Sequence, residues 1–168
     1  MKEFVIADLH LGHRNILEYE PRPCYSVEEM DEFLIHNWNE TISDEDIVWV
    51  LGDFALCGSD RIIELVGRLN GRKRLIKGNH DKKTPTFWKK AGFENYYDSP
   101  IHRLIRQQWV VLSHEPVPIE PEWINVHGHT HSQPTGLNPN THRCVSVELI
   151  NYRPILLDIV LRRNYNAI

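Results

Sequence analysis

Cysteine is scarce in this sequence: Cys24, Cys57 and Cys144 are widely spaced, and none belongs to a C-x-x-C pair. An odd and scattered set indicates neither a disulfide framework nor a zinc site built on thiolates. Long apolar runs are missing too, since the longest, at 47–51, is far too short to cross a bilayer. Asp8 interrupts the first apolar stretch before a signal peptide forms. We therefore expect a cytoplasmic protein without a membrane partner, and the sequence does not set its oligomeric state.

The charge is unevenly spread along the chain, although the formal net charge is only -4. Residues 1–60 hold 14 Asp and Glu against 3 Lys and Arg, whereas residues 61–106 hold 4 against 12. The basic segment suits a polyanion such as nucleic acid, and a solvated basic face explains it equally well. Trp88 and Tyr96 or Tyr97 in this segment have ring faces that could stack on bases, but we expect at least half of these rings in the core.

The length and the apolar pattern predict one α/β domain over residues 1–168. Helical spacing is found at 26–40, which opens with a Ser26–Glu29 capping box, and more weakly at 84–92. A third helix is expected from Ser59 or Asp60 to Gly71. Strand and helix alternate in the first half, which predicts a parallel sheet, and the second half is richer in strands. The predicted strands are residues 4–7, 47–52, 74–78, 109–113, 123–128, 144–147 and 155–160.

Polar residues follow the predicted strands at five places. Because the carboxyl ends of strands form the ligand sites of open α/β sheets, we expect these five places to converge. Each alone has an ordinary explanation, since a lone Asp after a strand is usually a turn or a helix cap. Together they are hard to explain as packing, because burying so many ionisable groups without a cation costs several kcal/mol for each. The residues are Asp8 and His10; Asp53; Asn79, His80 and Asp81; His114; and His127, His129 and His131.

The residue types in this set indicate a divalent metal. Imidazole, carboxylate and amide groups without thiolate suit Mn, Fe, Zn, Co or Ni. The set is larger than one ion needs, and two ions that share a carboxylate lie about 3.5 to 4 Å apart, the usual arrangement for hydrolysing phosphate esters. Asp53 is the sole carboxylate after its strand and suits such a bridge. Gly128 is expected to permit a turn that separates His127 from His129 and His131.

Five short motifs occur in order along the chain: DLH at 8–10, GD at 52–53, GNHD at 78–81, His114 in LSHEP, and GHTH at 128–131. In type and order they resemble the motifs of the calcineurin-like metallophosphoesterases, and most closely a small bacterial and phage-type subgroup. The resemblance implies an α/β fold, a four-layer α/β/β/α sandwich of two mixed β-sheets flanked by helices. It also implies an enzyme that hydrolyses phosphate esters with two divalent metal ions, manganese first among them.

The resemblance also implies a role for each motif residue. His80 is expected to be the catalytic histidine that faces the leaving group, and Asp81 to orient it. His127 is expected to be structural rather than a metal ligand. The ligands implied for the first ion are Asp8, His10 and His131, and for the second Asn79, His114 and His129, with Asp53 as the bridge.

Substrate and mechanism stay open between alternatives at this point. His13, Arg14 and Asn15 either bind the substrate phosphate or begin a helix. The apolar residues at 54–57, where many relatives carry charge, predict an apolar substrate-facing edge. We expect a phosphodiesterase acting on nucleotides or nucleic-acid ends, because the chain is short for a large cap domain. A phosphomonoesterase, a metal-dependent nuclease and a non-catalytic metal-binding scaffold are the alternatives, and an intact His80 disfavours the last.

Overall fold

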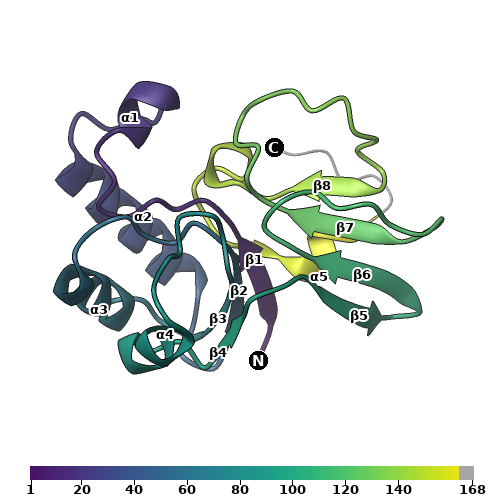
Figure 1. Cartoon of the computed structure of the whole chain (residues 1–168), viewed down its shortest axis with the longest axis horizontal. Helices are drawn as coiled ribbons and strands as arrows, with labels where there is room; N and C mark the ends of the chain where they lie inside the picture. Colours follow the sequence, from purple (N-terminus) through teal and green to yellow (C-terminus); the bar gives the residue numbers. More distant parts are fainter. Residues whose placement is uncertain (163–168) are drawn as a thin grey trace.

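Two mixed β-sheets with a common buried apolar core form the fold (Figure 1). The computed structural model describes residues 1–162. The larger sheet has the strand order β4-β3-β2-β1-β9, and the smaller sheet has the order β5-β6-β7-β8. The strands are β1 Glu3–Ile6, β2 Ile47–Leu51, β3 Arg72–Ile76, β4 Asn95–Tyr97, β5 Ile101–Ile105, β6 Gln108–Leu112, β7 Ile124–His127, β8 His142–Cys144 and β9 Ile155–Leu156.

The direction of the strands brings their carboxyl ends together. Strands β1 to β4 run parallel, and β9 pairs antiparallel with β1. In the smaller sheet β6, β7 and β8 run parallel, and β5 pairs antiparallel with β6. A single parallel bridge between Ala7 and Ser146 joins the end of β1 to the chain that follows β8. The two sheets therefore meet beside the carboxyl ends of their parallel strands.

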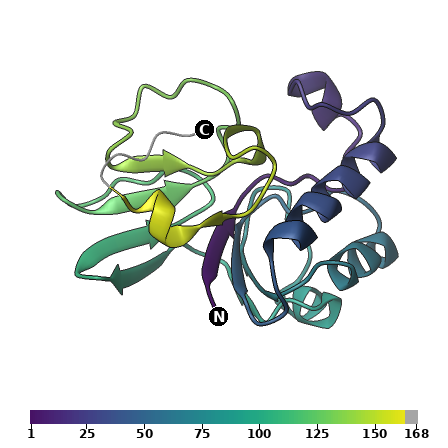
Figure 2. The ribbon, with the colours of Figure 1, turned by 180° about the vertical axis from the view of Figure 1, so that it is seen from behind.

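The longer helices cover the side of the larger sheet that faces away from the smaller one (Figures 1 and 2). Short helix α5 contacts β1 and β9 instead. None of the helices within residues 1–162 combines the length and the apolar content needed to span a bilayer. The helices are α1 Ile16–Tyr19, α2 Val27–Thr41, α3 Ser59–Gly67, α4 Pro85–Ala91 and α5 Leu157–Val160, with a 3-10 turn, η1, at Val147–Leu149.

Local signals placed two of the helices correctly. The Ser26 hydroxyl accepts a hydrogen bond from the Glu29 amide at the start of α2, and the Thr84 hydroxyl does the same for the Phe87 amide of α4. Helix α4 ends at Gly92, whose φ of 116 is left-handed, as a helix stop requires.

Helix α3 is shorter than the sequence indicated. It begins at Ser59, one of the two starts that the sequence indicated, but it ends at Gly67 instead of reaching Gly71. The residues after Gly67 bond to side chains of α2: Trp38 donates to the Asn70 carbonyl at 3.0 Å, and Asn39 donates to the Arg68 carbonyl at 2.8 Å. The predicted end was wrong because these contacts come from α2, which is distant in sequence, so the local pattern at 59–71 does not reveal them.

The strand predictions fail where the apolar run is short or where the strand contains few consecutive apolar residues. Residues 155–160 were expected to form one strand, but only 155–156 do, and Leu157 and Val160 bury one face of α5. The strand expected at 144–147 is β8 at 142–144, followed by η1. Strands β4 and β5 carry half-buried and alternating residues and gave no apolar run to detect. Apolar runs this short do not distinguish strand from helix.

Candidate metal centre

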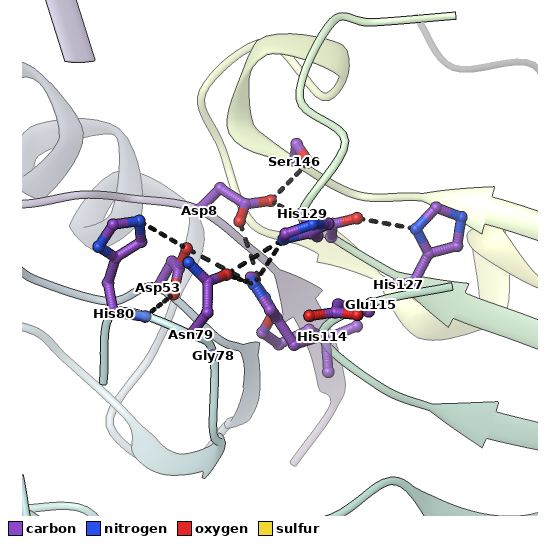
Figure 3. Close-up of polar contacts among 12 residues, drawn as sticks. Asp8, Asp53, Gly78, Asn79, His80, His114, Glu115, His127, His129 and Ser146 are labelled. Carbon is purple, nitrogen blue, oxygen red and sulfur yellow. Dashed lines mark hydrogen bonds and ion pairs between the residues drawn. The ribbon is translucent and has the colours of Figure 1, made fainter. Parts of the chain in front are cut away.

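Residues from the ends of five strands meet at the junction of the two sheets (Figure 3). Asp8 follows β1 and Asp53 follows β2, and the Asp8 amide donates to the Gly52 carbonyl at 3.1 Å. His129, which follows β7, donates its amide to Asp8 Oδ2 at 2.9 Å. The convergence expected from the sequence is therefore present, and it joins the first motif to the last.

The first group of ligand atoms belongs to Asp8, His10 and His131. One ligand atom from each of these residues lies within 4.8 Å of the other two. Asp8 Oδ1 and His10 Nε2 are buried and have no hydrogen-bond partner among the described residues. Because an unpaired buried polar atom is costly, two orphaned acceptors that share a small space fit the binding of a cation.

The second group belongs to Asn79, His114 and His129. Asn79 Oδ1 lies 2.8 Å from His114 Nε2 and 3.1 Å from His129 Nδ1, and the two ring nitrogens are 3.2 Å apart. Asp53 Oδ2 lies 3.5 Å from His114 Nε2 and 3.6 Å from His10 Nε2. Asp53 thus stands between the two groups, where a carboxylate can serve both. The donor set of imidazole, carboxylate and amide fits two divalent cations.

The backbone of these motifs is strained. A left-handed conformation, which costs about 1 to 3 kcal/mol for a residue with a side chain, occurs at five of the seven expected ligands. Such strain is retained where the surrounding structure over-determines it, and its concentration here marks a functional site. The five residues and their φ angles are Asp8 at 60°, His10 at 52°, Asp53 at 51°, His129 at 69° and His131 at 47°.

Gly128 is needed for space rather than for the turn expected from the sequence. It lacks a left-handed φ, and the turn is made by His129. A Cβ at position 128 would lie 2.5 Å from Ala7 Cβ and 2.6 Å from Asp8 Oδ2. The His127 ring points away from the cluster and bonds the Gly128 carbonyl through Nδ1 at 2.8 Å (Figure 3).

Asp81 does not contact the His80 ring, contrary to the orienting role expected for it. Its carboxylate accepts hydrogen bonds from the amides of Asp53 at 2.8 Å, Gly78 at 2.9 Å and Phe54 at 3.1 Å. Both oxygens are therefore committed to the backbone of two motifs. Asp81 holds the GD turn against the GNHD turn, which places it behind the metal centre.

His80 and His13 line an open cleft of about 340 Å³ over the metal centre. The His80 ring lies 5.3 Å from the His10 ring, centroid to centroid, and its Nε2 is 3.9 Å from Asp53 Oδ2. His13 Nδ1 is 3.1 Å from His10 Nδ1. Arg14 and Asn15, which were considered with His13 as phosphate ligands, are exposed and are not among the residues that line the cleft.

Residues 54–57 do not form the apolar substrate-facing edge expected from the sequence. Phe54 is fully buried, and its ring packs edge to face on Phe93 and Trp88, with centroid distances of 5.2 and 6.1 Å. The side chain belongs to the core between the larger sheet and α4, and none of 54–57 is among the cleft-lining residues. The expected contact with substrate was wrong, because Phe54 and Ala55 are buried in the core and Leu56, although exposed, does not line the cleft.

Burial and neighbouring charges set the protonation of the ligand residues. Burial raises the pKa of Asp8 to about 7 and lowers the pKa of His10 to about 2. Burial also lowers the pKa of His131, but the hydrogen bond to Glu148 and the charge of Asp8 outweigh it, and the pKa is raised. His10 is therefore neutral, the form of histidine that binds a metal ion.

Three polar residues beside the centre gave no signal in the sequence. The Ser146 hydroxyl donates to Asp8 Oδ2 at 2.5 Å. Arg22 and Glu148 form a buried ion pair with Nη2 and Oε1 2.7 Å apart, and Glu148 also bonds His131. None of the three lies in a motif, and Arg22 and Glu148 are 126 positions apart. Only the folded chain brings them to the site.

Comparison with known proteins identifies the family. A family model described as calcineurin-like phosphoesterase matches residues 1–162. An uncharacterized protein of Methanocaldococcus jannaschii is 36% identical over 168 residues, covering 96% of this chain and 90% of its own. The gene 66 protein of Mycobacterium phage D29 is 36% identical over 111 residues, and the match spans 64% of this chain but 49% of the phage protein. The chain belongs to the calcineurin-like phosphoesterase family.

Solved structures agree on the fold. A protein of unknown function from Aquifex aeolicus superposes with a TM-score of 0.71 at 23% identity and covers 92% of this chain and 94% of its own. The nuclease MPE of Pseudomonas putida superposes with a TM-score of 0.50 at 21% identity, covering 77% of this chain and 61% of its own. The expected fold of two mixed sheets flanked by helices is confirmed. Metal-dependent hydrolysis of phosphate esters is the activity of this family.

Proposed function

We propose that the chain is a phosphodiesterase with two divalent metal ions. The observation that carries the proposal is the position of Asp53 Oδ2, 3.6 Å from His10 Nε2 in one ligand group and 3.5 Å from His114 Nε2 in the other. Asp8, His10 and His131 would hold one ion, and Asn79, His114 and His129 the other. When bound, two such ions supply hydroxide at neutral pH and neutralise charge on the phosphoryl oxygens.

His80 supplies the proton that the leaving oxygen needs. Its backbone amide donates to Asp53 Oδ1 at 2.8 Å, which ties the residue to the bridging carboxylate. Its side chain is 36% exposed and lines the cleft, so it can reach a bound ester and exchange protons with solvent. This placement supports the role of general acid, and a binding scaffold without catalysis has no use for it.

The charge of the cleft favours diesters over monoesters. No Lys or Arg is among its lining residues, and Glu20 is. A phosphate monoester carries close to two negative charges at neutral pH and a diester carries one. Because no Lys or Arg side chain of the lining adds positive charge to that of the two proposed ions, the cleft favours the ester with the smaller charge. Ile16 and Tyr19 on α1 give the far wall an apolar surface for the second ester group.

The basic composition of residues 61–106 suggests a nucleic-acid substrate, but the contacts of these residues give that substrate little support. Most of its Arg side chains are paired with carboxylates of the same protein, and Lys73 donates to two backbone carbonyls. Trp88 is fully buried, and Tyr96 and Tyr97 pack against the core. The ion pairs are Arg61 with Asp31 and Glu64, Arg68 with Glu32, Arg72 and Arg74 with Glu94, Arg103 with Glu3, and Arg106 with Asp158.

Relative rates on two model esters test the substrate class. The purified chain, loaded in turn with Mn, Fe, Zn, Co and Ni, is assayed with bis-nitrophenyl phosphate and with nitrophenyl phosphate. We expect the larger kcat/KM on the diester. A larger kcat/KM on the monoester would overturn the diester preference while leaving the metal centre in place.

A further inference from the structure

We propose that Arg22 and Glu148 are positioning residues of the metal centre. Arg22 contacts the first motif, Glu148 contacts His131, and the two side chains bind each other. This proposal rests on the proposed metal-dependent function, because it assigns the two residues the task of holding the ligand segment 8–10 and His131 in the geometry that binds the first ion. We call the pair the Arg22–Glu148 clamp.

Arg22 holds the backbone of the first motif. Its Nη2 donates to the Asp8 carbonyl at 2.7 Å, and its Nη1 donates to the Leu9 carbonyl at 2.7 Å. On the other side of the segment, the amides of Asp8 and His10 donate to the carbonyls of Gly52 and Asp53. The left-handed residues Asp8 and His10 are thus fixed by hydrogen bonds from both directions, which is what a strained segment needs to persist.

Glu148 holds the last ligand. Its Oε1 lies 3.2 Å from His131 Nδ1, so that Nε2 remains as the ring nitrogen for a metal ion. The same oxygen accepts from Arg22 Nε at 3.0 Å and Nη2 at 2.7 Å. Glu148 lies in η1, and the Val147 amide beside it donates to the Ala7 carbonyl at the end of β1. The carboxylate is therefore placed by the same segment, the end of β1, that leads into Asp8.

The burial of the pair separates a positioning role from a merely stabilising one. The Arg22 and Glu148 side chains are 1% and 4% exposed. Replacing a buried ion pair by apolar residues of similar volume is often neutral or stabilising, so stability alone does not account for the pair. A positioning role instead predicts that the apolar replacement folds and loses metal affinity.

Substitution at Glu148 isolates the charge. Glu148→Gln keeps an oxygen that can accept from His131 and Arg22, and it places the amide nitrogen at Oε2, which has no hydrogen-bond partner among the described residues. The double variant Arg22→Met with Glu148→Met removes the clamp without leaving one charge buried and unpaired. Glu3→Gln is the matched control, because Glu3 accepts hydrogen bonds from Arg103 and Trp49 at the opposite end of β1.

Calorimetric titration of the metal-free chain with Mn²⁺ tests the clamp, and thermal melting followed by circular dichroism checks the fold. We expect both clamp variants to fold and to bind one of the two ions about 10- to 100-fold more weakly, the usual effect of losing an outer partner of a ligand, while Glu3→Gln keeps the parental affinity. Parental affinity for both ions in both clamp variants would overturn the clamp alone. A parent that binds no metal ion would overturn the clamp and the proposed function together. If Glu148→Gln fails to fold, the double variant decides.

Discussion

Asp53 and His114 follow strands of different sheets, yet Asp53 Oδ2 lies 3.5 Å from His114 Nε2. The same oxygen lies 3.6 Å from His10 Nε2, so one carboxylate connects both ligand groups. This relationship makes the metal centre a property of the junction between the sheets. Neither sheet alone holds the complete set of ligands.

Asp53→Asn should therefore disturb both ions at once. An amide cannot bridge two cations as a carboxylate does, and we expect less than one tightly held ion per chain and a loss in kcat/KM of more than about 100-fold, because outer partners alone account for 10- to 100-fold. Elemental analysis of the purified variant measures the metal content. Retention of two ions at parental affinity would show that Asp53 is not the bridge.

His80→Ala separates proton donation from metal binding. We expect the variant to keep the parental metal content and to lose about 10²- to 10⁴-fold in kcat, the contribution of a general acid. The loss should be smaller with a nitrophenol leaving group, which departs readily without a proton, than with an alkyl alcohol. His36→Ala is the matched control, since the His36 side chain is 67% exposed on α2. An equal loss with both leaving groups would rule out proton donation.

The affinity for metal should depend on pH through Asp8. In the metal-free chain burial raises the pKa of Asp8 to about 7, so below that pH a proton must leave before the carboxylate binds a cation. Burial lowers the pKa of His10 to about 2, so His10 carries no proton to release. The pKa of His131 is raised as well, so its proton must also leave before it binds a cation. Affinity is therefore expected to fall as the pH drops through 7.

Titration calorimetry in buffers of different ionisation enthalpy measures the protons released. We expect proton release upon Mn²⁺ binding at about pH 5.5 and much less at about pH 8. Equal affinity at the two values, with no proton released at either, would contradict the raised pKa of Asp8.

Two glycine substitutions test the close packing of the motifs. Gly128→Ala places a methyl group 2.5 Å from Ala7 Cβ and 2.6 Å from Asp8 Oδ2, and we expect a loss of about 1 to 3 kcal/mol in unfolding free energy together with weaker metal binding. Gly67→Ala is the control, because a Cβ there meets nothing within 4 Å in α3. That variant should gain up to about 1 kcal/mol. Urea unfolding measures the unfolding free energy of both variants. A Gly128→Ala variant with the parental unfolding free energy would refute the steric role of Gly128.

Local features of the chain could be predicted, and features that depend on distant contacts could not. The five residues of β2 are all buried, so the central strand has the apolar run that its sequence predicts. Each motif likewise begins within two residues of the end of a strand. The position of Phe54 in the core and the hydrogen bonds of Asp81 to backbone amides required the fold, because nothing next to them in sequence indicates their partners.

Charge gives the clearest example of information that only the fold supplies. The acidic first third and the basic middle third appeared as an asymmetry along the chain. In space the carboxylates of Glu3, Asp31 and Glu32 bind Arg103, Arg61 and Arg68, so much of the asymmetry cancels. The pairing of Arg22 with Glu148 is equally invisible to a local pattern.

Titration of the metal-free chain with Mn²⁺, with hydrolysis of bis-nitrophenyl phosphate followed at each step, tests the binuclear phosphodiesterase most directly. We predict that the rate rises until two ions are bound per chain and then stays constant, and that Asp53→Asn abolishes the rise. A plateau at one ion per chain would contradict the binuclear centre. No hydrolysis of either model ester with Mn, Fe, Zn, Co or Ni would contradict the assignment of this chain as a metal-dependent phosphodiesterase.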